Sequence, residues 1–304
     1  MRSRKYKLKR WTMFDVVIMV LATFVCFVTL YPMLYVVACS ISEPLRVLAG
    51  DVKLWPVGFS TKAYEIVCLN ADFWKSMLNT VLYVVAGCLL MFFTTVVMSY
   101  PLTRPNLKFR KFVVFFLLIP MYFGGGMIPS FLVITKLGLY NTIWALILPG
   151  AVNIGHIILC RTYMASLSNE LIDSALIDGC NHFRTLSSIV VPLSKPVIAV
   201  IMIYTIVGVW NSWFSAAIYT TKESLQPLQL YMKKALSATQ GLASSKDFLK
   251  GLPVEELKRF QELAMAADQI KYAMIVLSTV PIIAVYPMFQ KYFTKGIMVG
   301  SLKG

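Results

Sequence analysis

The chain alternates between long apolar runs and shorter polar segments. Six runs reach or approach the roughly 20 residues that an α-helix needs to cross about 30 Å of hydrocarbon, at about 1.5 Å per residue. These runs are residues 14–38, 77–100, 112–134, 143–160, 196–217 and 272–289. The pattern predicts an all-α membrane protein with six transmembrane helices in one domain, residues 13–294.

The first apolar run has two interpretations. The basic start (residues 1–12) and the sequence Val36-Val37-Ala38-Cys39 fit a cleaved signal peptide of the lipoprotein kind. However, the run has 25 residues, which exceeds the roughly 7–15 apolar residues of a signal-peptide core. We therefore expect residues 14–38 to remain as a membrane anchor behind a basic cytoplasmic arm.

Composition agrees with a membrane protein and sets its orientation. Of the 304 residues, 58% are hydrophobic and 14% are charged, whereas a soluble domain carries about a quarter charged residues. The net charge of +15 suits nucleic-acid binding, but the aromatic residues lie in the apolar runs, so we expect the lipid bilayer and not nucleic acid as partner. Six Lys and Arg among the first ten residues predict a cytoplasmic N-terminus, and six spans then make the C-terminus cytoplasmic too.

This orientation leaves two long loops and a tail. Residues 161–195 form the largest cytoplasmic loop, and residues 218–271 form an extracellular loop. Within the extracellular loop, residues 254–269 have the periodicity of an amphipathic helix. Residues 295–304 form a short cytoplasmic tail.

Residue types that perform catalysis or bind metals are scarce. No Gly-Lys dipeptide occurs, so a Walker A phosphate loop is absent, and the two His and six Cys lack metal-ligand spacing. Asp15 and His156 are too few for the proton relay of an ion-coupled secondary carrier. The spans also lack the convergent polar groups of a membrane enzyme. The sequence therefore favours a transport subunit with no catalytic residues and no metal site.

The cytoplasmic loop predicts two short helices that meet at an elbow. Ser168 or Asn169 can cap the first helix, Gly179 is a left-handed helix stop, and Asn181 can cap a second helix that Pro192 ends. The first helix carries an apolar patch made of Leu171, Ile172, Ala175 and Leu176. By itself this pattern also fits an amphipathic connector on the membrane surface.

The same loop carries a family signature. Asp173-Ser174-Ala175, followed by Asp178-Gly179 and later by Val191-Pro192-Leu193, resembles the Glu-Ala-Ala signature of ATP-binding-cassette (ABC) importer permeases. Three residues depart from it: the family's Glu is Asp173, its first Ala is Ser174, and the small Ala after its Asp-Gly is Cys180. Glu170 is therefore a second candidate for the acidic contact.

Other segments narrow the resemblance to carbohydrate-uptake permeases, the group of the smaller permease of the maltose importer. They are Leu78-Asn79-Thr80, Trp210-Asn211 and the ending at residues 295–304. The stretches 124–129 and 224–229 look most like permeases of complex-oligosaccharide systems. The resemblance covers nearly the whole chain.

The resemblance implies a type I ABC importer permease of MetI-like fold in the bacterial cytoplasmic (inner) membrane. It implies uptake of an oligosaccharide or polysaccharide fragment, with a non-sugar solute as the alternative. The implied partners are a second permease, two ATPase subunits and an extracellular solute-binding protein. ATP and Mg would bind to the ATPase subunits, and this chain would bind no cofactor.

The resemblance also assigns residues to ATPase contacts. The residues expected to couple to the ATPase are Glu170, Asp173, Ser174, Ala175, Asp178, Gly179 and Pro192. In the C-terminal tail, the residues expected to contact the ATPase are Gly296, Gly300, Lys303 and Gly304.

The solute path has weaker candidates. Pro120, the glycines at 124–126 and Pro129 break the third span, and irregular backbone inside a membrane faces protein or a water-filled cavity. The path candidates are Asn79, Tyr83, Gly125, Trp210, Asn211 and Trp213. An interfacial aromatic belt explains the tryptophans equally well, and close helix packing explains the glycines.

Overall fold

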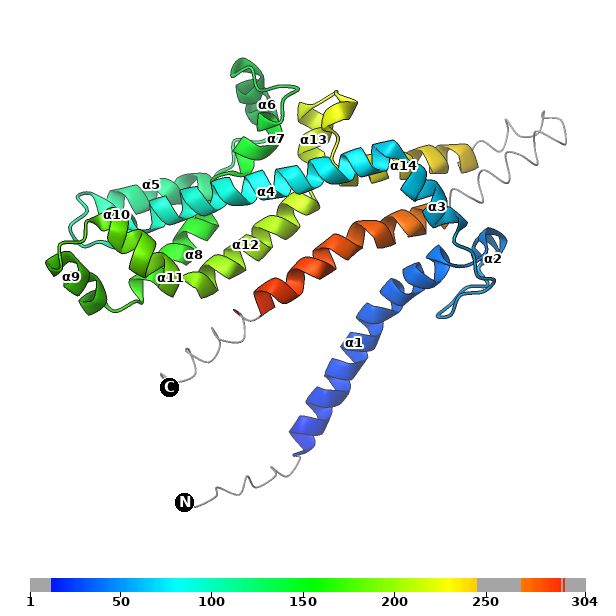
Figure 1. The fold of residues 1–304 in the computed structure, drawn as a ribbon, viewed down its shortest axis with the longest axis horizontal. Helices are drawn as coiled ribbons and strands as arrows, with labels where there is room; N and C mark the ends of the chain where they lie inside the picture. The colour runs from blue at the N-terminus through cyan, green and yellow to red at the C-terminus, as the bar shows by residue number, and fades with distance from the viewer. Residues whose placement is uncertain (1–11, 245–268, 291, 293–304) are drawn as a thin grey trace. The chain divides into compact units, whose positions relative to one another are not determined.

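The computed structural model describes residues 12–244, 269–290 and 292 (Figure 1). These residues are helical apart from turns, loops and one isolated antiparallel bridge between Ser42 and Phe59, so the all-α prediction is confirmed. Most of the basic arm (residues 1–11), most of the predicted helix 254–269 and the tail at 295–304 lie outside the described residues. The chain divides into two compact units, Met1–Leu69 with Ala238–Leu277, and Asn70–Ser237 with Ser278–Gly304.

The first unit contains α1 (Met13–Ser40), α2 (Pro44–Ala49) and α3 (Lys62–Leu69). A reciprocal cap starts α1, because the Thr12 N–H donates to the Asp15 carboxylate at 2.9 Å and the Asp15 N–H donates to the Thr12 hydroxyl at 3.3 Å. Most of α1 is exposed, and its small buried cluster consists of Ala38, Cys39, Val47 and Val52. An apolar helix with so little buried surface suits contact with lipid.

The second unit is organised around α4 (Ala71–Ser99), with α8 (Ile154–Ala165) and α12 (Lys195–Trp210) packed beside it (Figure 1). The Ser99 hydroxyl of α4 donates to the backbone carbonyl of Ile157 at 2.9 Å. The buried cluster that joins these helices contains Met91, Val96, Tyr100, Cys160, Met164, Ile172, Leu186, Val190, Val197 and Ile201. This cluster extends from the spans into the predicted cytoplasmic loop.

Within the described ranges, three uninterrupted helices are long and apolar enough to cross a membrane: Met13–Ser40, Ala71–Thr103 and Gln269–Gln290. The others are bent. α5 (Arg110–Tyr122) meets α6 (Met127–Lys136) at 111°, and α7 with η2 (Trp144–Gly150) meets α8 at 43°. The segment His182–Leu193 meets α12 at 79°. Counting each bent pair as one span gives up to six spans in the described part of the chain.

The interruption of the third run is confirmed. α5 continues past Pro120 to Tyr122, and the chain breaks at residues 123–126, where Gly126 has φ of +85°. The fourth run is interrupted at residues 151–153 before Asn153 caps α8, accepting a hydrogen bond from the His156 N–H at 3.1 Å. In the break at residues 123–126, glycine accommodates the positive φ of position 126 without strain.

The prediction of one continuous helix over residues 196–217 is wrong. α12 ends at Trp210, and α13 (Phe214–Tyr219) begins after a three-residue interruption. The Asn211 side chain donates to the Val207 carbonyl at 3.0 Å, the acceptor that its own backbone N–H also uses. An Asn side chain that competes for backbone partners favours a helix end. Beyond α13 the chain runs through η4 (Glu223–Leu225) to α14 (Leu228–Ser244).

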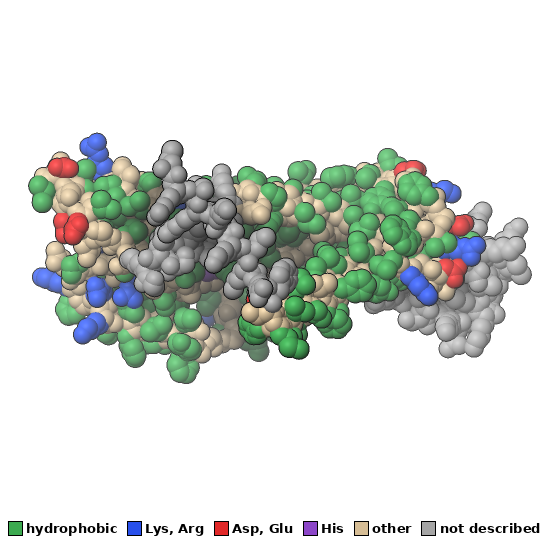
Figure 2. All heavy atoms as spheres, turned by 90° about the horizontal axis from the view of Figure 1, so that it is seen from below, with side chains coloured by type: hydrophobic (Ala, Val, Ile, Leu, Met, Phe, Trp, Pro, Cys, Tyr) green, Lys and Arg blue, Asp and Glu red, His purple; other side chains and the backbone are tan. Residues whose placement is uncertain are grey.

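Apolar side chains are prominent on the described surface (Figure 2). Within α1, none of the most apolar 18-residue window is buried, and in α4 the buried share of that window is 33%. Exposed apolar side chains on helices of this length are the pattern of a protein whose solvent is the bilayer.

Candidate functional site

The predicted cytoplasmic loop folds as two helical segments joined by an elbow. α9 (Asn169–Ile177) ends at Gly179, whose φ is +82°. The Cys180 N–H donates to the Ala175 carbonyl at 2.9 Å and the Gly179 N–H donates to the Leu176 carbonyl at 3.1 Å, which together form a Schellman cap. The predicted left-handed stop at Gly179 is therefore confirmed.

The second segment starts as predicted but ends later. Asn181 caps α10 (His182–Thr185), since its side-chain oxygen accepts from the Arg184 N–H at 2.8 Å. Pro192 does not end the segment, which continues through the wide π turn Leu186–Val190 and α11 (Val191–Leu193). Proline lacks a backbone N–H, and the wider turn directly before it accommodates the missing hydrogen bond. The chain bends after Leu193.

The loop is anchored by one face of α9. Ile172 is 1% exposed and Ala175 is buried, and Ile172 belongs to the same cluster as Leu186 and Met164. Leu171, which the sequence placed in the same patch, is instead 51% exposed. Anchoring through the core makes the elbow a rigid projection of the helices rather than a surface connector.

The opposite face of the elbow presents the predicted acidic residues. Glu170, Asp173 and Asp178 are exposed, and none has an ion-pair partner within the described part of the chain. The Ser174 hydroxyl is occupied, because it donates to the Glu170 carbonyl at 2.8 Å. The carboxylates are therefore available to a partner.

Sequence reasoning missed two large apolar side chains at the elbow. Ile177 is 86% exposed and Phe183 is 75% exposed, on either side of the glycine turn. The signal was present, since Ile177 falls outside the apolar stripe of α9 and Phe183 directly follows the start of α10. Exposed apolar groups beside exposed carboxylates are typical of a docking surface.

A groove of about 600 Å³ lies between the elbow and the end of α4. Asp173, His182 and Phe183 line one side, and Tyr100 and Arg104 line the other. The Tyr100 hydroxyl and the His182 Nδ1 are 3.3 Å apart, and the Arg104 guanidinium lies 5.1 Å from the centre of the Tyr100 ring. These contacts tie the elbow to the second predicted span.

Two path candidates use their polar atoms to hold residues 224–226 in place. The Asn79 amide donates to the carbonyls of Ser224 at 2.8 Å and Gln226 at 3.1 Å. The Tyr83 hydroxyl donates to the Leu225 carbonyl at 2.8 Å. Their part in a solute path stays a prediction, while their contacts with residues 224–226 are a feature of the fold.

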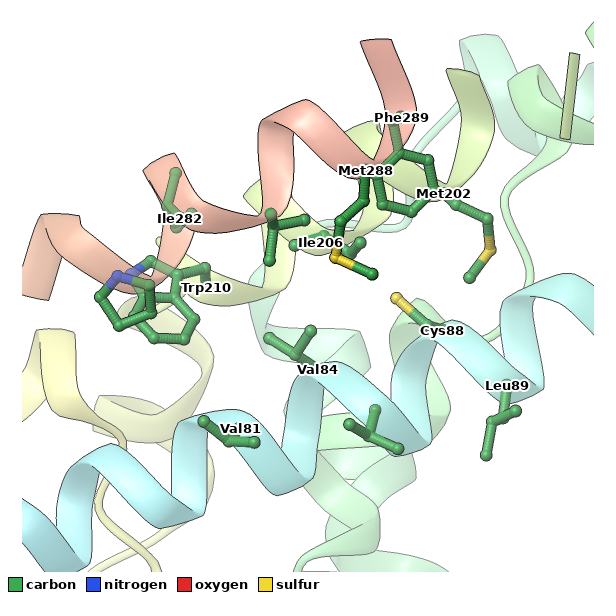
Figure 3. Close-up of a pocket in the computed structure, with 13 residues that line it drawn as sticks. Val81, Val84, Cys88, Leu89, Met202, Ile206, Trp210, Ile282, Met288 and Phe289 are labelled. Carbon is green, nitrogen blue, oxygen red and sulfur yellow. The ribbon is translucent and has the colours of Figure 1, made fainter. Parts of the chain in front are cut away.

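Trp210 does not lie on an open face. It is 5% exposed and lines an apolar groove of about 400 Å³ with Cys88, Met202 and Ile206 and with residues of the last helix (Figure 3). Trp213 holds the Lys233 ammonium 3.0 Å from its ring centre. Asn211 and Gly125 are exposed, so these two candidates remain accessible.

No group of three or more His, Cys, Asp or Glu side chains that is suited to a metal ion occurs among the described residues. The buried thiols of Cys39, Cys88 and Cys160 are free, and none belongs to a disulfide.

Comparisons with known proteins agree with this geometry. Residues 89–299 match the family described as "Binding-protein-dependent transport system inner membrane component". Protein LplC of Bacillus subtilis (strain 168) is 36% identical over 91% of this chain and 90% of that protein. The polygalacturonan/rhamnogalacturonan transport system permease protein YtcP of the same organism is 33% identical over 96% of this chain and 99% of that protein.

Solved structures give the same result. A chain in the crystal structure of a bacterial ABC transporter involved in the import of the acidic polysaccharide alginate has a TM-score of 0.80 and 33% identity, covering 92% of this chain and 96% of that one. A chain from the alginate ABC transporter in complex with an alginate pentasaccharide-bound periplasmic protein, at 14% identity and a TM-score of 0.51, supports the fold alone. The chain therefore belongs to the binding-protein-dependent transport system inner membrane components, and is a multi-pass ABC importer permease subunit that is a transport component and not an enzyme.

Proposed function

We propose that this permease takes up an oligosaccharide or a fragment of a polysaccharide. The observation that carries the proposal is the match, at 33% identity over more than nine-tenths of this chain in each case, to YtcP and to the alginate importer. The name of YtcP gives polygalacturonan and rhamnogalacturonan as its transported substrates, and the other transporter is described as importing the acidic polysaccharide alginate. A non-sugar solute is the alternative.

The proposed assembly contains this chain, a second permease, two ATPase subunits and an extracellular solute-binding protein. Both termini of this chain lie in the cytoplasm, and ATP with Mg binds to the ATPase subunits and not to this chain. The last residues of the tail, including Gly296, Gly300, Lys303 and Gly304, contact the ATPase. The absence of a Walker A sequence in this chain supports this division of labour.

The elbow is the proposed contact with one ATPase. Asp173, with Glu170 or Asp178 beside it, meets basic groups of the ATPase, and Ile177 and Phe183 enter an apolar recess. The exposure and lack of ion-pair partners of the carboxylates support this role, as does the exposure of the two apolar side chains. Because Ile172 packs into the core cluster, a movement of the elbow also moves α4, α8 and α12.

The test is uptake by the reconstituted complex. Proteoliposomes with the complete transporter and its binding protein are supplied with ATP inside and one labelled solute outside. The panel contains trigalacturonate, an alginate trisaccharide, maltotriose, a tripeptide and sulfate. We expect ATP-dependent uptake of at least one saccharide and none of the other two solutes. Uptake of the tripeptide or sulfate alone, with no saccharide transported, would contradict the proposal.

A further inference from the structure

One face of α12 is polar and aromatic although the helix is otherwise apolar. Tyr204 and Gly208 of α12 and Asn211 directly after it are exposed and recur at helical spacing on this face, with one exposed apolar residue, Val207, among them. Tyr204 is 62% exposed, whereas Ile201 and Thr205 on the inner face are 2% and 5% exposed. A tyrosine, a glycine and an asparagine aligned on a membrane helix do not form the surface that lipid tails favour.

A histidine of the neighbouring helix extends this face. The His156 ring of α8 stacks on the Tyr204 ring, with 6.5 Å between the ring centres and 21° between their planes. Asn153 fixes the start of α8 by accepting from the His156 backbone N–H. The Nδ1 atom of His156 is buried and has no hydrogen-bond partner within the described residues. A polar atom left in this state is costly for the fold, which favours a role for the ring beyond packing.

Both members of this His156–Tyr204 pair lie at the same depth. His156 precedes the end of α8 at Ala165 by nine residues, and Tyr204 follows the start of α12 at Lys195 by nine residues. Nine residues of α-helix rise about 13.5 Å, close to half of a hydrocarbon core of about 30 Å. Since both helix ends lead into the elbow loop, the pair lies near the middle of the membrane.

The apolar groove beside α12 is a poor alternative for a polar solute. Met202, Ile206 and Trp210 point into it from α12, and its other walls come from α4 and the last helix (Figure 3). All of its lining residues are apolar, so a sugar hydroxyl would find no hydrogen-bond partner there. α12 therefore separates an apolar face from the face that carries Tyr204.

We propose that the His156–Tyr204 pair forms a saccharide contact of the solute path, which rests on the function proposed above. The apolar face of a pyranose ring stacks on Tyr204, and saccharide hydroxyls bond to the Nε2 atom of His156 and to the Asn211 side-chain oxygen. Aromatic stacking with few hydrogen bonds holds a sugar in transit without trapping it.

The first experiment asks whether the pair faces water. Tyr204→Cys is compared with Tyr286→Cys in the assembled transporter, because Tyr286 is a similarly exposed tyrosine, 57%, but lies on the last helix. Both are treated with a charged, water-soluble maleimide. We expect labelling above the wild-type background at Tyr204→Cys and not at Tyr286→Cys. No labelling at Tyr204→Cys means that lipid or the second permease covers it, and overturns the proposal.

The second experiment measures uptake of the saccharide that the wild-type complex transports. We expect Tyr204→Ala to lower uptake about tenfold, as loss of one good contact does, and Tyr204→Phe to stay within about twofold. Tyr286→Ala is the control and should transport like wild type. Equal uptake by Tyr204→Ala and wild type overturns the contact. Failure of the wild type to transport any saccharide instead contradicts the proposed function, while the maleimide result still reports the path.

Discussion

The elbow glycine gives a direct test of coupling. Gly179 has φ of +82°, and a Cβ added there meets nothing within 4 Å, so Gly179→Ala introduces backbone strain without a clash. An L-residue in the left-handed region costs roughly 1–2 kcal/mol. That penalty corresponds to a factor of about 5–30 in an equilibrium. We therefore expect the affinity of the elbow for its ATPase to fall by up to about 5–30-fold. Transport measured with a limiting concentration of the ATPase subunit should fall with it.

The assay is ATP hydrolysis stimulated by the loaded binding protein, measured beside uptake in the same proteoliposomes. Gly138→Ala is the matched control, because Gly138 has φ of +69°, also with nothing within 4 Å, but lies after α6 and outside the elbow. Gly179→Asn should retain most activity, since Asn tolerates the left-handed region. Wild-type coupling in Gly179→Ala, or an equal loss in Gly138→Ala, would refute the role assigned to the elbow.

Three further changes test neighbouring features. Asp173→Ala should lower stimulated ATPase activity by up to about fivefold, because an exposed ion pair is worth about 0–1 kcal/mol, and Asp173→Glu should retain the activity. If the activity falls only when Glu170→Ala is added, Glu170 makes the main contact. Ile172→Ala, at 1% exposure, should cost about 2–5 kcal/mol and lower the thermal stability of the complex, whereas Leu171→Ala, at 51%, should change it little. Tyr83→Phe should cost about 0.5–1.5 kcal/mol through the lost bond to residues 224–226, seen as faster proteolysis of that segment. Unchanged proteolysis would contradict that anchoring.

The structure of the elbow could be predicted from the sequence because it depends on local interactions. Gly179 and Asn181 act on their own turn, so a left-handed stop and a side-chain cap follow from residue type and spacing. The membrane helices could be predicted from the apolar runs for the same reason, because a helix satisfies its own backbone hydrogen bonds inside a membrane. The interruption at residues 123–126 follows from a run of three glycines.

Contacts between segments that are distant in the sequence could not be predicted from it. Asn79 looks like a free amide in the sequence, yet its partners lie 145 and 147 residues away. Trp210 and Tyr204 are both aromatic residues of one helix, and only their neighbours decide that the first lines an apolar groove while the second stays exposed. The stop of the helix at Trp210 has only a weak sign in the sequence, Asn211, because neither glycine nor proline marks that break.

The packing explains how a movement at the elbow reaches the proposed path. Ile172 of α9 and Val190 of the π turn share one buried cluster with Val197 and Ile201 of α12. A close-packed interior is poorly compressible, so displacement of α9 moves the first turns of α12 rather than being absorbed between them. Tyr204 lies one turn beyond Ile201 on the same helix, but on its exposed side. A push on the elbow therefore shifts Tyr204 relative to whatever faces it across the proposed path. Under the proposed function, this movement is how closure of the ATPase would displace a bound sugar.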